Sequence, residues 1–222
     1  MDISQRLKTK ASDAWEDGYR HPFVQELGEA ALPIEKFRFY LLQDYQYLSA
    51  YAKLFALAAV KSDTFELAAR FIGLAHSTFN EEIKVHRDYM ASFGISEEQV
   101  DACKASLSNQ AYTSYMLSIA FTGSLADIIA AVLPCAWTYA DYAKRLKIDY
   151  KAQLDNNYYK SWIEAYASSE YSASFDWLFP VLDNLCINLD SKGEQRLEEI
   201  FISSLKFEYL FWETAYNCQT SY

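Results

Sequence analysis

Residues that interrupt helices are scarce in this chain. Its 222 residues include only 6 glycines and 4 prolines, and neither type clusters into a linker. Inside a helix, Gly costs about 1 kcal/mol and Pro about 3 kcal/mol relative to Ala. The helix-favouring residues Ala, Leu, Glu and Lys are common instead. The sequence therefore predicts an all-α protein.

Apolar residues recur with helical spacing along almost the whole chain, and no segment shows sustained strand alternation. We expect a capping box at Ser96-Glu97-Glu98-Gln99 with a short helix after it, a cap at Asp63, and a helix end at Gly94. A chain of this length favours one domain, so we expect a single helical bundle over residues 1–222. The other predicted helices cover residues 3–19, 22–27, 34–61, 64–93, 109–121, 125–146, 153–167, 172–189 and 193–217.

Charge and hydropathy exclude several classes of partner. The net charge of −10 and the pI of about 4.8 disfavour a nucleic-acid partner. The first residues lack the apolar core of a signal peptide. Apolar stretches are broken by Lys53 or Pro134 and are shorter than the ~20 residues that span a bilayer. We expect a cytoplasmic protein without a membrane partner.

The composition is richest in aromatic residues. There are 18 Tyr, 14 Phe and 5 Trp, or 17% of the chain. A buried Tyr needs a partner for its hydroxyl, and a cavity lined by rings with polar tips suits a flat heteroaromatic ligand. A Tyr-rich core without a ligand explains the composition equally well, so both interpretations stay open.

The tripeptide Leu133-Pro134-Cys135 lies inside a strong helical pattern. Proline in a helix interior costs roughly 3 kcal/mol. A proline beside a thiol, with Tyr139 one turn after the thiol, indicates a shaped pocket. The alternative is an inert buried cysteine. The four cysteines are scattered, without C-x-x-C spacing, and are expected to be free thiols (Cys103, Cys135, Cys186 and Cys218).

Other chemically capable residues share helix faces. Glu208 lies among apolar and aromatic residues, and Asp44 lies beside Gln43. Each carboxylate either faces solvent or is buried and able to transfer protons. The pairs that share a face are Asp44 with Tyr47, Tyr112 with Tyr115, Cys135 with Tyr139, and Trp162 with Tyr166.

Metal and cofactor motifs are missing from the sequence. A di-iron bundle needs Glu-x-x-His pairs, and none of His21, His76 and His86 has a Glu three residues before it. Glu82 precedes His86 by four residues, and His21 precedes a proline, as a helix-start residue does. The chain also lacks a G-x-S-x-G elbow and a Gly-rich phosphate loop. We expect no metal and no cofactor.

Five segments resemble the TenA/thiaminase II family in the order in which that family has them. They are His21–Val24, Phe37–Tyr45, Leu133–Tyr139, Trp162–Ile163 with Tyr166–Ser168, and Glu208–Trp212. The resemblance implies a haem-oxygenase-like helical fold used without haem, in a homotetramer without metal. It also implies conversion of 4-amino-5-aminomethyl-2-methylpyrimidine, and more weakly of thiamin, to 4-amino-5-hydroxymethyl-2-methylpyrimidine in thiamin salvage.

The same resemblance implies roles for individual residues. Cys135 matches the nucleophile, Glu208 the acid that carries protons, and Asp44 the carboxylate that binds the aminopyrimidine edge. Ala136 departs from a proline that is frequent after the cysteine. The positions that line the ring pocket or orient the catalytic groups are Tyr47, Tyr112, Tyr139 and Tyr166, and relatives have Phe at the first of these in some cases.

Three other functions stay open from the residues. A non-catalytic binder of thiamin or pyrimidines would bind ligand tightly and release no product. An oxidative or haem-handling enzyme on the same bundle would contain iron. A structural interaction protein would expose apolar stripes where this chain has tyrosines and acids.

Overall fold

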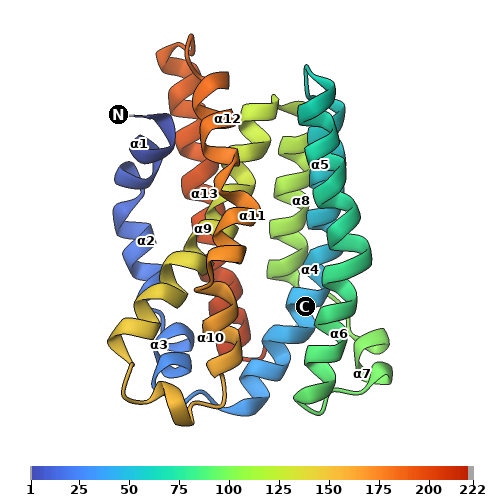
Figure 1. Cartoon of the computed structure of the whole chain (residues 1–222), viewed down its shortest axis with the longest axis vertical. Coiled ribbons are helices and arrows are strands. Elements are labelled where there is room, and N and C mark those ends of the chain that lie inside the picture. Colours follow the sequence, from blue (N-terminus) through green and yellow to red (C-terminus); the bar gives the residue numbers. More distant parts are fainter. Residues whose placement is uncertain (1, 220–222) are drawn as a thin grey trace. The chain divides into compact units, whose positions relative to one another are not determined.

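The computed structural model describes residues 2–219, apart from the side chains at positions 81, 82, 84 and 85. Every regular element in that part of the chain is a helix, and none is a strand (Figure 1). The all-α prediction is confirmed. None of the helices described is both long enough and apolar enough to cross a membrane.

The chain divides into two compact units. The first unit is Met1–Leu32 with Ile129–Glu213, and the second is Pro33–Ile128 with Thr214–Tyr222. Two of the three boundaries fall inside the long helices α9 (Leu125–Asp149) and α13 (Ser191–Tyr216), and the third falls between Leu32 and Pro33. The single domain expected over residues 1–222 stays a prediction.

The first unit contains more, shorter helices than the sequence pattern predicts. The predicted helix 3–19 is broken at Ala11, the predicted helix 153–167 begins only at Lys160, and the predicted helix 172–189 is two helices. Besides parts of α9 and α13, the elements are α1 (Ile3–Lys10), α2 (Ser12–Tyr19), α3 (Pro22–Gly28), η2 (Leu154–Asn156), α10 (Lys160–Tyr166), α11 (Ser169–Asp176) and α12 (Leu178–Leu185).

Helix α3 shows how polar side chains close the helix ends of this unit. The Nδ1 atom of His21 accepts a hydrogen bond from the N–H of Phe23 at 3.1 Å, and Pro22 occupies the first turn. The prediction that His21 starts a helix is confirmed. At the other end, Nδ2 of buried Asn157 donates to the carbonyls of Leu27 and Gly28, at 2.9 and 3.1 Å. Carbonyls in the last turn have no partner within the helix, so Asn157 satisfies them.

The second unit is built around α4 (Ile34–Val60), which lies beside α5 (Phe65–Ser77) (Figure 1). The predicted helix 64–93 is interrupted by a π-helical segment, η1 (Thr78–Glu82), and continues as α6 (Ile83–Ser92). The remaining helices are α7 (Glu97–Ala102) and α8 (Leu107–Thr122).

Two of the three helix ends predicted from local sequence signals in this unit are confirmed. Ser96 and Gln99 form the predicted capping box. Gly94 ends α6 with a φ of 73°, a left-handed conformation that glycine adopts without strain. The predicted cap at Asp63 is wrong, because the hydroxyl of Thr64 accepts the hydrogen bond from the N–H of Leu67, at 3.2 Å.

Two helical glycines lead to opposite predictions for the same substitution. A Cβ at Gly18 would lie 2.4 Å from the hydroxyl oxygen of Tyr142. That hydroxyl is buried and donates to the carbonyl of Trp15 at 2.6 Å. Gly18→Ala must displace it and should lower the free energy of unfolding by about 1–3 kcal/mol. Urea unfolding followed by circular dichroism measures the change.

Gly73, in α5, is the matched control. A Cβ there meets no atom within 4 Å. Gly73→Ala should raise the free energy of unfolding by about 0.5–1 kcal/mol, because Ala loses less backbone entropy than Gly in a helix. Equal shifts of the two variants in one direction would contradict the contact between Gly18 and Tyr142.

Candidate active site

Cys135 lies on helix α9 at the point where a run of buried residues ends. Residues 125–134 are all buried, and Cys135 is the first residue of the helix that is partly exposed. Pro134 lies inside the helix and has no N–H to donate. The hydroxyl of Thr138 donates to the carbonyl of Pro134 at 2.8 Å and lies 3.2 Å from the main-chain carbonyl of Cys135. A side chain one turn on thus holds the main chain beside the thiol.

An aromatic cluster follows one turn after Cys135. The rings of Tyr139 and Tyr166 meet edge to face, with centroids 4.9 Å apart. Trp212 lies 5.0 Å from Tyr139, and Trp162 lies 4.6 Å from Tyr166. Such contacts between rings add to the stability that burial supplies. The cluster joins α9, α10 and α13 and offers aromatic surface beside the helix that carries the thiol.

Glu208, one turn before Trp212 on α13, is buried. Only 4% of the residue is exposed, so the solvent-facing alternative that the sequence left open is wrong. Its negative charge acts on Tyr142 of α9. The pKa of the Tyr142 phenol is raised, with burial as the largest cause and the charge of Glu208 as the second. The first unit therefore contains a thiol, a buried carboxylate and a ring cluster on neighbouring helices.

Asp44 is a buried carboxylate of the second unit. It is 8% exposed, so the surface-acid alternative is also wrong. Its Oδ2 atom lies 2.9 Å from Nε2 of His86 on α6 and 3.4 Å from the hydroxyl of Tyr40, one turn earlier on α4. A carboxylate with these partners is suited to bind the polar edge of a ligand.

Tyr47 and Tyr112 extend the same part of the second unit. Their ring centroids are 5.5 Å apart, and Tyr47 stacks on Tyr51 at 5.3 Å. The hydroxyl of Tyr47 lies 3.6 Å from Sδ of Met116 on α8. Asp44 and the two tyrosines thus come from one face of α4 and from the helix packed against it.

Gln43 fixes α8 against α4. Its Oε1 accepts a hydrogen bond from the N–H of Ser106 at 2.8 Å, and its Nε2 donates to the carbonyl of Lys104 at 3.1 Å. The side chain of Asn109 donates in turn to the main-chain carbonyl of Gln43 at 2.7 Å. These bonds set the register in which Tyr112 meets Tyr47.

The predicted site residues are thus divided between the units. The first unit contains Cys135, Tyr139, Tyr166 and Glu208, and the second contains Asp44, Tyr47 and Tyr112. Sequence reasoning missed Tyr40, Gln43 and His86. Tyr40 stands one turn before Asp44, so helical spacing was sufficient to find it. No local pattern relates His86 to Asp44, because the two are far apart in the chain.

The chain is similar to known proteins over nearly its whole length. A model of the TENA/THI-4/PQQC family matches residues 8–218. This chain belongs to that family. An aminopyrimidine aminohydrolase of Halalkalibacterium halodurans is 43% identical over 98% of this chain and 96% of its own length. One from Helicobacter pylori is 38% identical over 98% of this chain and 100% of its own length.

Solved structures show the same relationship. A TenA homologue from P. horikoshii OT3 has a TM-score of 0.89 and 31% identity, over 99% of this chain and 100% of its own. A domain with a heme oxygenase-like fold from Shewanella denitrificans has a TM-score of 0.78 at 16% identity over 98% of this chain and 93% of its own, which shows the fold alone. The family resemblance and the predicted haem-oxygenase-like fold are confirmed.

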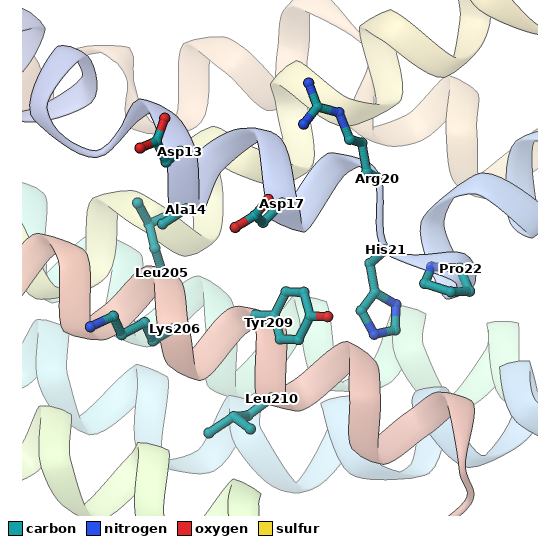
Figure 2. Close-up of a pocket in the computed structure, with 10 residues that line it drawn as sticks. All are labelled: Asp13, Ala14, Asp17, Arg20, His21, Pro22, Leu205, Lys206, Tyr209 and Leu210. Atoms are coloured by element: carbon teal, nitrogen blue, oxygen red, sulfur yellow. The ribbon is translucent and has the colours of Figure 1, made fainter.

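A hollow of about 730 Å³ on the first unit is lined in part by residues of the resembling segments, among them His21 and Tyr209. Figure 2 shows Tyr209 of α13 between Lys206 and the imidazole of His21, with Asp17 on the facing helix. None of the predicted site residues lines the hollow. The Nε2 atom of His21 lies 3.0 Å from Glu213, and burial lowers the pKa of the imidazole. We assign this hollow no part in the chemistry.

Groups of three or more metal-ligating side chains do not occur among the residues that the structure describes. The side chain of Glu82, the acid nearest before His86, is outside that set. That the protein works without a metal or cofactor stays a prediction.

Gln43→Met tests the anchor of α8. The change keeps the side-chain length but removes both hydrogen-bonding atoms, so the N–H of Ser106 loses its acceptor. We expect the free energy of unfolding to fall by about 1–3 kcal/mol, measured by urea denaturation. Gln46→Met on the same helix is the control, because Gln46 makes no side-chain hydrogen bond within the described residues. Equal changes in the free energy of unfolding for the two substitutions would contradict the proposal that Gln43 holds α8 against α4.

Proposed function

We propose that this protein hydrolyses thiamin-related aminopyrimidines in thiamin salvage. Its substrate is 4-amino-5-aminomethyl-2-methylpyrimidine, with thiamin as a weaker substrate, and its product is 4-amino-5-hydroxymethyl-2-methylpyrimidine. The similarity to aminopyrimidine aminohydrolases over 98% of the chain carries this proposal. The buried carboxylates and the aromatic clusters support it, because they suit a flat ring with polar edges.

In the proposed reaction Cys135 is the nucleophile. Its thiolate adds to the electron-poor pyrimidine ring and forms a carbon–sulfur bond, which removes the aromaticity of the ring. The exocyclic amine then leaves as ammonia once it is protonated. Water adds at the exocyclic carbon, the carbon–sulfur bond breaks, and the thiolate is regenerated. Covalent catalysis of this kind divides one slow displacement into easier steps.

Glu208 and Asp44 have complementary roles in this proposal. Glu208 protonates the leaving amine and then takes a proton from the attacking water, which are the tasks of a general acid and base. Asp44 hydrogen-bonds the ring nitrogen and amino edge and so promotes addition to the ring. Tyr47, Tyr112, Tyr139 and Tyr166 line the ring pocket or orient these groups.

We also propose that the protein is a homotetramer, as the family resemblance implies, and that it acts in the cytoplasm without nucleic acid or membrane. Exposed apolar side chains support association between copies. In the second unit Phe65 is 93% exposed, Val60 82% and Phe121 68%. Exposed apolar surface that gathers into a patch marks an interface.

Purified protein incubated separately with the aminomethyl pyrimidine and with thiamin tests the activity. Formation of the hydroxymethyl pyrimidine, detected by chromatography, supports the hydrolase. Tight binding of either compound without product would favour the non-catalytic binder instead.

Cys135→Ser tests the nucleophile. A serine hydroxyl is far less ionised than a thiol at neutral pH, so hydrolysis should be lost. Calorimetry should show that the product pyrimidine still binds with nearly unchanged affinity. Cys218→Ser is the control, because Cys218 is exposed and belongs to the other unit. Wild-type turnover by Cys135→Ser would remove Cys135 from the mechanism.

Glu208→Gln tests proton transfer with little change in shape. Positioned acid–base catalysis contributes about 10²–10⁴-fold, so kcat should fall by that factor while the affinity for the product changes little. Steady-state kinetics and calorimetry separate the two quantities. Glu198→Gln, on the same helix and only partly buried, should leave both unchanged. A loss confined to affinity would show that Glu208 binds substrate and transfers no proton.

A further inference from the structure

The imidazole of His86 lies against the Asp44 carboxylate. Its Nε2 lies 2.9 Å from Oδ2, an ion-pair distance without the alignment of a hydrogen bond, and the two side chains are only 16% and 11% exposed. The hydroxyl of Tyr40 approaches the same oxygen at 3.4 Å. Both contacts thus occupy Oδ2. Within the described residues Oδ1 makes no hydrogen bond or ion pair, which leaves that oxygen for a ligand.

A neighbouring contact holds His86 in place. Nε of Arg87 donates to the hydroxyl of Tyr45 at 2.9 Å, and its guanidinium also donates to Asp101 at 3.0 Å. Two successive residues of α6 therefore contact two successive residues of α4. This double attachment restricts both sliding and rotation of α6 along α4.

The π-helical segment η1 aims His86 at α4. Thr78, at the start of η1, is buried. In a regular helix of about 3.6 residues per turn, the position seven residues on would share its face. The wider π turn contains one extra residue and moves the inward face on by one position, to His86. The next inward position, four residues on, is the fully buried Met90. Single π turns are frequent at functional sites.

We propose that His86 is a positioning residue that orients Asp44 and gives the protein its preference for pyrimidines with a 4-amino group; this inference rests on the proposed function. His86 holds Oδ2, so that Oδ1 accepts an N–H of the amino group. A ligand without that group leaves a buried carboxylate oxygen unpaired, which sites built for hydrogen bonding reject strongly. His86 itself touches no reacting atom.

Affinity measurements with two ligands test this role. The ligands are 4-amino-5-hydroxymethyl-2-methylpyrimidine and the analogue with hydrogen in place of the 4-amino group. In His86→Leu, Asp44 is no longer oriented, so the amino compound should lose its hydrogen bond to this carboxylate. Its Kd should then rise about tenfold or more, as expected for a hydrogen bond to a charged group. The Kd of the analogue should change by less than about threefold, because it forms no such bond. Calorimetry measures both.

Two further variants make the result specific. His86→Gln retains an N–H donor and should stay within about threefold of wild type for both ligands. His76→Leu, at an exposed position on α5, controls for the loss of a histidine and should match wild type. A general structural role predicts equal losses for the two ligands and no rescue by Gln, and either result would overturn the proposal.

The outcomes also distinguish this inference from the proposed function. If the wild type binds the amino compound but never forms product from the aminomethyl pyrimidine, the hydrolase fails, while the two affinities still decide the role of His86. If the wild type hydrolyses its substrate and His86→Leu keeps wild-type affinities, the role of His86 alone is wrong. If the wild type binds neither pyrimidine, both are wrong.

Discussion

Two buried carboxylates, Glu208 and Asp44, impose the main constraint on this structure, whereas a third, Asp127, accepts a hydrogen bond from the N–H of Ser124 at the start of α9. Moving a charged carboxylate out of water is costly unless nearby groups compensate. Glu208 and Asp44 are nonetheless only 4% and 8% exposed, in a chain whose net charge is already −10. Asp44 is compensated by an imidazole and a phenol. A protein without a ligand for these groups would gain stability by replacing them with apolar residues, so their burial favours a functional role.

The helices around these carboxylates are held by polar side chains that bond main-chain groups. Gln43 bonds the segment that leads into α8, Asn157 bonds the end of α3, and Thr138 bonds the carbonyls beside Cys135. The hydrophobic effect that packs the helices together has no preferred direction. Directional bonds to the main chain set a single register, and the site depends on register because each helix presents only one face.

The comparisons add what geometry does not contain. Aromatic rings and buried carboxylates are compatible with many flat ligands, whereas two of the relatives that match nearly the whole chain are named aminopyrimidine aminohydrolases. The hydrolase and a pyrimidine-binding protein of the same fold would share the pocket residues. In the hydrolase Cys135 and Glu208 take part in turnover, whereas in the binding protein they would have no catalytic role.

The sequence by itself determined the helical class, because Gly and Pro are too rare to interrupt helices often and apolar spacing is continuous. It also indicated Cys135, Glu208 and Asp44 through their family motifs, and His21 and the Ser96 capping box through local chemistry. It did not determine the breaks at Ala11 and η1, because no Gly or Pro marks them. Burial of the two carboxylates, the anchoring by Gln43 and the pairing of His86 with Asp44 were decided only in the tertiary structure. These contacts join residues far apart in the chain, and helical spacing relates only residues within a few turns of each other.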